Sequence, residues 1–208
     1  MKQCVLVLEF GKNVYNDNLV EYLKPKYIVK RYDLFQDKNI KNHDYSTIDY
    51  LILGGAKYTI GINKLLKLPK NATFNPLYEA YAIINQLKHK PILGVGYGCL
   101  VLGLYYKCSV DKLSNPNHNR KQHLIIDHRY KINRFPSNES TNMLITFNNK
   151  NKLNVPSESG IDVIAFSAEN IFDSCGFRFN TKHYGFLFRL IDTKFGKNFL
   201  NNFFSYHS

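Results

Sequence analysis

The sequence predicts an α/β fold with a mostly parallel central sheet, flanking helices and an antiparallel hairpin excursion in its second half. Short apolar segments rich in Val, Ile and Leu alternate with segments of helical periodicity, which is typical of a sheet covered on both faces. Two apolar segments end in glycine turns, and a polar, basic stretch at residues 115–142 breaks the alternation. We therefore expect strands and helices to alternate outside that stretch and hairpins to form within it.

The individual elements follow from local patterns. The predicted strands are residues 4–10, 27–34, 49–56, 91–96, 161–169, 175–180 and 183–190. The predicted helices are residues 16–24, 75–90, 98–107 and 193–206. The second of these helices has a proline near its start and lysines near its end, as the helix dipole favours. No repeat or long linker divides the chain, so residues 1–208 are predicted to form a single domain.

The composition is that of a globular protein with a high positive charge. Hydrophobic residues make up 44% and charged residues 21% of the 208 residues, which argues against intrinsic disorder. A formal net charge of +12 suits nucleic acid, anionic lipid or an acidic protein as a partner, and equally a basic surface without one. No apolar stretch approaches the roughly 20 residues of a membrane span, so no membrane association is expected.

The cysteines indicate a reducing compartment. Cys4, Cys99, Cys108 and Cys175 form no CxxC pair, and three of them have apolar neighbours. This predicts reduced, buried thiols and a cytoplasmic location. The apolar run near the N-terminus is a poor signal peptide because Glu9 interrupts it. Abundant Asn, Lys, Ile and Tyr favour an A/T-rich source genome, and a viral source would place the protein in a virion or viral factory.

The segment "PILGVGYGCLVLGLYY", residues 91–106, predicts a buried strand, a sharp glycine turn and a helix. Enzymes use this layout to present a nucleophile, because the strained turn exposes its tip residue and the helix N–H groups favour an anion beside it. The residue at the tip is Gly96, which has no side chain with which to attack.

Four segments, in order and with similar spacing, resemble the motifs of one enzyme family. They are "LGGA" at residues 53–56, "GVGYGCL" at 94–100, "TFNN" at 146–149 and "GFLFRLI" at 185–191. The pattern resembles the class I glutamine amidotransferases, and most of all the glutaminase domain or subunit of GMP synthetase. The resemblance spans nearly the whole chain and implies a flavodoxin-like fold.

The resemblance also places departures at the family's catalytic positions. The nucleophilic Cys corresponds to Gly96, the His to Arg189 and the triad Glu to Ile191. The Gln that holds substrate glutamine corresponds to Leu100, and Phe147 stands in the altered "TFNN" loop. Arginine is a permanent cation and not a base. The resemblance therefore implies a catalytically inactive pseudo-glutaminase without a cofactor.

Backbone features of the family are retained. Gly54 and Gly55 keep the second glycine turn, and the N–H groups of Gly55 and Tyr97 are expected as vestigial oxyanion donors. Leu100 and Phe147 are expected to line the old pocket.

Two side chains near the elbow have alternative roles. Cys99 lies one helical turn beyond the tip, so we expect a buried structural thiol and not a substitute nucleophile. Arg189 is expected to pair with Asp192 or to bind an anion in the old pocket, and pairing is favoured.

The densest basic segment follows the elbow helix. Its candidate contacts to an anion or nucleic acid are Arg120, Lys121, Arg129, Lys131 and Arg134. The alternative is a solvated basic hairpin without a ligand. Histidines recur there at every fifth residue, which is unlike the spacing of metal ligands, so no metal site is predicted.

These observations favour a non-catalytic binding, scaffolding or structural role, with a protein partner or a homo-oligomer. One alternative is a degenerate glutaminase subunit that partners a GMP synthetase-type subunit. Another is a basic, nucleic-acid-associated structural protein of a virus. An enzyme with a reused pocket would need a new acid–base pair near the elbow, and the sequence shows none.

Overall fold

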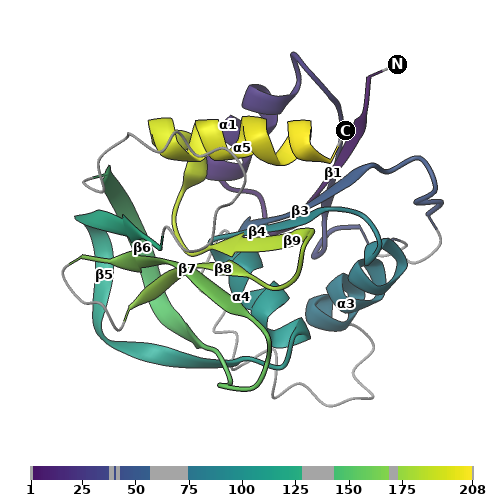
Figure 1. The fold of residues 1–208 in the computed structure, drawn as a ribbon. Helices are drawn as coiled ribbons and strands as arrows, with labels where there is room; N and C mark the ends of the chain where they lie inside the picture. The colour runs from purple at the N-terminus through teal and green to yellow at the C-terminus, as the bar shows by residue number, and fades with distance from the viewer. Residues whose placement is uncertain are drawn as a thin grey trace.

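A single sheet of nine strands organises the described part of the chain (Figure 1). The computed structural model describes residues 2–37, 40, 43–56, 75–127, 143–168 and 173–207. Of these, residues 114–120, 143 and 146–150 are described by their backbone only. The strand order is β2-β1-β3-β4-β9-β8-β7-β5-β6, so the sheet has a parallel half and an antiparallel half.

The parallel half holds five strands, as the apolar segments predict. In spatial order they are β2 (Ile28–Asp33), β1 (Cys4–Phe10), β3 (Tyr50–Ala56), β4 (Ile92–Val95) and β9 (His183–Phe186). β1 and β4 are buried at every residue because both faces of the sheet are covered. The strand predicted to run to residue 190 ends at Phe186 and is followed by a short 3-10 helix, η2 (Leu190–Asp192).

Helices cover both faces of the parallel half. Helices α1 (Val14–Leu23) and α5 (Lys194–Tyr206) lie on one face, and α3 (Pro76–Leu87) and α4 (Tyr97–Tyr105) lie on the other (Figure 1). Side-chain caps begin three of them, and the cap of α1 is Asn13, three residues before the predicted start at residue 16. α5 contributes an aromatic core face, where the Tyr50 hydroxyl donates to the Phe204 carbonyl at 2.9 Å.

The antiparallel half corrects one expectation. It consists of β8 (Ser174–Arg178), β7 (Asp162–Ser167), β5 (Ser109–Ile126) and β6 (Met143–Asn154). The polar segment from residue 115 was expected to form short strands, but 18 residues form one long strand paired with β6. The pairing with β6 shifts register twice between Lys112 and Arg120. Such bulges allow a long strand to bend while it stays paired with its neighbour. The rest of the predicted excursion, residues 128–142, lies outside the described residues.

A buried ion pair fixes β2 and α1 to β1. Glu9 of β1 is fully buried, and Arg31 of β2 donates to both of its carboxylate oxygens. Arg31 also reaches Asp17 of α1 at 2.6 Å. Burial raises the pKa of Glu9, so loss of Arg31 would leave an uncompensated carboxylate in the core.

Candidate functional site

The elbow between β4 and α4 has the geometry that presents a nucleophile. Gly96, at its tip, has φ 59° and ψ −115°, a conformation that side-chain-bearing residues adopt only under strain. Its N–H donates to the Phe186 carbonyl of β9 at 2.7 Å, which fixes the turn against the next strand. Among the described residues, a Cβ atom built on Gly96 would meet no atom within 4 Å. With respect to the described residues the tip therefore has room for a side chain, and glycine supplies none.

Neighbouring glycines let α4 approach the sheet closely. A Cβ on Gly98 would lie 2.0 Å from the Leu53 carbonyl oxygen of β3. One on Gly94 would lie 2.7 Å from the Cα of Cys99. Both distances are impossible for a real side chain, so these glycines are required by packing and not by catalysis.

Gly54 and Gly55, which were predicted to form a second glycine turn, lie instead near the carboxyl end of strand β3. They contact a residue that the sequence did not reveal as part of the site. Asn16 of α1 is fully buried, and its side chain accepts from the Gly55 N–H at 2.9 Å and donates to the Gly55 carbonyl at 3.1 Å. Its Oδ1 atom would also lie 2.8 Å from a Cβ on Gly54. The Gly55 N–H, expected as a vestigial oxyanion donor, therefore already has a protein acceptor.

The other three residues expected in the pocket, Tyr97, Leu100 and Phe147, lie in different surroundings. Tyr97 is the first residue of α4, where backbone N–H groups lack helical acceptors. Its ring packs 5.0 Å from Phe10, and its buried hydroxyl has no hydrogen-bond partner among the described residues. Leu100 is 3% exposed and belongs to the hydrophobic core. Phe147 pairs with Arg120 on the β6–β5 ladder, so the "TFNN" segment lies in a strand and not in a loop.

Arg189 and Ile191 follow β9 but have different surroundings. The Arg189 guanidinium lies 3.8 Å from Asp192 and 5.7 Å from the centre of the Tyr15 ring, which confirms the expected pairing. Tyr15 is buried and accepts a hydrogen bond from the Leu190 N–H at 3.1 Å. Ile191 is buried at 8% exposure, so no charged group stands at its position.

Solved structures with the same architecture were found, whereas no protein-family profile and no curated protein sequence matches the chain. A candidate GMP synthase component from Thermoplasma acidophilum superposes with a TM-score of 0.76 at 21% identity, over 100% of this chain and 94% of its own. A glutamine amidotransferase from Thermotoga maritima gives 0.67 at 14% identity, over 91% and 76%. The structure of PurLQS from Thermotoga maritima gives 0.67 at 14% identity, over 100% of both chains.

The chain has the class I glutamine amidotransferase fold. In this amidotransferase fold the parallel strands carry the elbow at their carboxyl ends, where ligands of open α/β sheets bind. Gly96 and the segment after β9 follow such strand ends, and Gly54 and Gly55 lie within the last three residues of β3. Three of the four matched segments thus lie at or directly after the carboxyl ends of parallel strands, whereas "TFNN" lies within β6.

Cys99 is a buried thiol, as predicted. It is fully buried, and its Sγ atom would lie 2.7 Å from a Cβ on Gly185 of β9. Burial raises the pKa of Cys99 well above the ordinary thiol value, and the nearby Cys108 and Cys175 raise it further. A thiol in these surroundings stays protonated and does not attack. All four cysteines are buried and free.

The structure describes only part of the basic segment. Arg120 and Lys121 lie on β5, where the Lys121 side chain is exposed and the Arg120 side chain is not described. Arg129, Lys131 and Arg134 lie outside the described residues. Within the described residues no group of three potential ligands could hold a metal ion, and no helix is long and apolar enough to cross a membrane.

Proposed function

We propose that this protein is a pseudo-glutaminase, which keeps the amidotransferase fold and acts by binding a partner without hydrolysing glutamine. The observation that carries the proposal is the elbow tip. Gly96 holds the strained conformation and has room beside it within the described part of the chain, yet it offers no nucleophilic atom. Removing the attacking atom of an acyl-transfer site costs many orders of magnitude in rate.

The surroundings of the tip support the same conclusion. By the motif correspondence, the base position is held by Arg189, which cannot accept a proton and is engaged with Asp192. The position of the orienting carboxylate is held by buried Ile191. The nearest thiol in sequence, Cys99, is buried behind the turn and protonated.

The test is release of ammonia from glutamine by the purified protein. We expect no release above a protein-free blank at any pH between 6 and 9. Release that disappears in Cys99→Ala would overturn the proposal, because it would show that the buried thiol reaches substrate. If a contaminating glutaminase is the source, ammonia release will persist in Cys99→Ala.

A partnership with a synthetase-type subunit is the second candidate. It is favoured by the superposition on the Thermoplasma acidophilum protein, which covers all of this chain. Mild purification from the native source, followed by identification of co-purifying proteins, tests it. Recovery of an ATP-using synthetase subunit would support it, and recovery of unrelated partners alone would contradict it.

A further inference from the structure

A row of lysines occupies the edge of the sheet where the parallel strands begin. Lys26 and Lys2 lie two residues before β2 and β1, Lys90 lies two residues before β4, and Lys182 directly precedes β9. The remaining strand, β3, is preceded by Asp49. In the spatial order of the strands, four of the five positions at this edge therefore carry a lysine. We call these four residues the lysine row.

The register of the sheet places the four lysines at nearly the same position along the strand direction. Cys4 pairs with Ile28, and Ile92 pairs with both Leu51 and His183, so the five strands begin at nearly the same height. Neighbouring strands lie about 4.8 Å apart, so the row extends over roughly 20 Å. This edge is opposite the elbow, which follows the carboxyl end of β4.

Most of the charge in the row is not neutralised. The Nζ atoms of Lys2, Lys26 and Lys182 contact the neutral oxygens of Pro25, Asn201 and His89 at 3.1, 3.1 and 3.0 Å. Among the described residues, only Lys90 of the four has a carboxylate nearby, Asp49 at 4.0 Å. Lys2, Lys26 and Lys182 are exposed. The three neutral contacts orient the ammonium groups without cancelling their charge.

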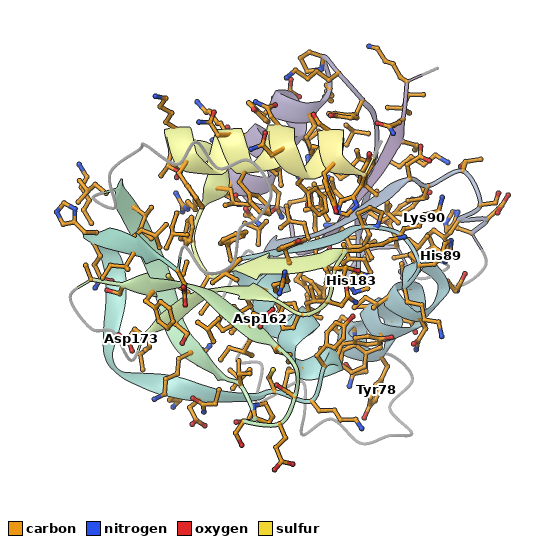
Figure 2. The ribbon with its side chains drawn as sticks, in the orientation of Figure 1. Tyr78, His89, Lys90, Asp162, Asp173 and His183 are labelled. Atoms are coloured by element: carbon orange, nitrogen blue, oxygen red, sulfur yellow. The ribbon has the colours of Figure 1, made fainter. Side chains whose placement is uncertain are left out.

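Further basic and aromatic side chains extend this edge. Lys90 and His89 lie at the same side of the molecule (Figure 2), and both ends of the chain also lie there (Figure 1). At the end of α5, Tyr206 is 63% exposed, and its ring lies 4.9 Å from that of His207. The same end of α5 contacts the row, because Lys26 donates to the Asn201 side chain at 3.1 Å, and the His207 ring packs 5.4 Å from that of Phe203 on this helix. The charge of Lys182, after burial, also lowers the pKa of His207.

We propose that the lysine row and Tyr206 form a binding surface for single-stranded nucleic acid. Lysines spaced by one strand, about 5 Å, or by two strands across β3, about 10 Å, can contact phosphates along one strand of nucleic acid, and an exposed aromatic ring beside them can stack on a base. An acidic peptide would use the charges but not the ring. The proposal does not depend on the function of the elbow, and it concerns residues other than the basic segment 120–134.

The test compares two variants of equal net charge by fluorescence anisotropy with a labelled 20-nucleotide oligothymidylate. The first variant is Lys26→Glu/Lys90→Glu/Lys182→Glu. The control is Lys12→Glu/Lys112→Glu/Lys197→Glu, which changes exposed lysines outside both the lysine row and the basic segment 120–134. We expect the row variant to bind about tenfold or more weakly and the control to stay within about threefold. Contact with four phosphates predicts a slope of log affinity against log salt of about −3.

Other outcomes would overturn the proposal. These are failure of the wild type to bind, equal losses in the two variants, or competition by polyglutamate as strong as competition by unlabelled oligothymidylate. The last result would assign the edge to acidic proteins. Tyr206→Ala separates the contribution of stacking: it should weaken oligothymidylate binding about five- to tenfold and leave heparin binding unchanged. Thermal unfolding of each variant verifies that it is folded.

Discussion

Gly96 and Gly98 are two residues apart in the elbow, and an added methyl group would meet very different surroundings at the two positions. At Gly98 it would lie 2.0 Å from a carbonyl oxygen of β3, whereas at Gly96 it would meet no atom of the residues that the structure describes within 4 Å. We expect Gly98→Ala to lower the free energy of unfolding by about 3 kcal/mol or more, because α4 must move off the sheet. Gly96→Ala should cost about 1–3 kcal/mol from backbone strain alone.

Urea unfolding of the two variants measures this difference. Equal losses would show that the close contact between α4 and β3 is not needed for stability.

The open space at Gly96 also allows the missing atom to be restored. We expect the thiol of Gly96→Cys to react with iodoacetamide in the folded protein, because it would stand exposed at a helix N-terminus that lowers its pKa. The four native cysteines are buried and should stay unlabelled in the wild type. Mass spectrometry after brief labelling measures both. Labelling of wild-type cysteines at the same rate would contradict the burial seen here.

A buried histidine links β9 to α4 at the element scale. His183 is 1% exposed; Tyr106 of the α4 end donates to its Nδ1 at 2.5 Å, and its Nε2 donates to the Lys90 carbonyl at 3.1 Å. Both ring nitrogens are therefore used in the neutral form. Burial lowers the pKa of His183 to about 4.

This arrangement predicts a loss of stability on acidification. The unfolded chain takes up the proton near the ordinary pKa of 6.5, before the folded protein does, so stability falls as the pH drops from about 6.5 to about 4. The loss is on the order of 3 kcal/mol. Urea unfolding at pH 7 and pH 4.5 measures it, with His183→Gln as the matched variant. An unchanged pH dependence in His183→Gln would assign the loss to other groups.

At the scale of the whole molecule, the two halves of the sheet differ in how they are covered. β1, β3 and β4 lie inside the parallel half between two helical layers, whereas β2 is an edge strand with Ile28 half exposed. We expect backbone amides of β1 and β4 to exchange with solvent last and those of β2 much earlier. Hydrogen exchange followed by mass spectrometry checks this order. Equal protection of β2 would mean that a further partner covers that edge.

Local sequence patterns predicted the parallel half well because its strands are buried on both faces. Such strands are continuous apolar runs, and they were located to within two residues at every start. The glycine elbow was equally evident, since only glycine tolerates both the turn and the close approach of α4. β5 was predicted poorly because polar residues in a strand resemble those of a loop.

The sequence by itself determined the α/β class, the buried thiols and the absence of a side chain at the elbow tip. Each of these follows from residue identity and local periodicity. Only the tertiary structure decided that Asn16 binds the backbone of Gly55 and that four lysines share one edge, because both depend on how distant segments are placed relative to one another. Asn16 and Gly55 are 39 positions apart in the sequence, and local residue patterns do not indicate contacts between segments that far apart.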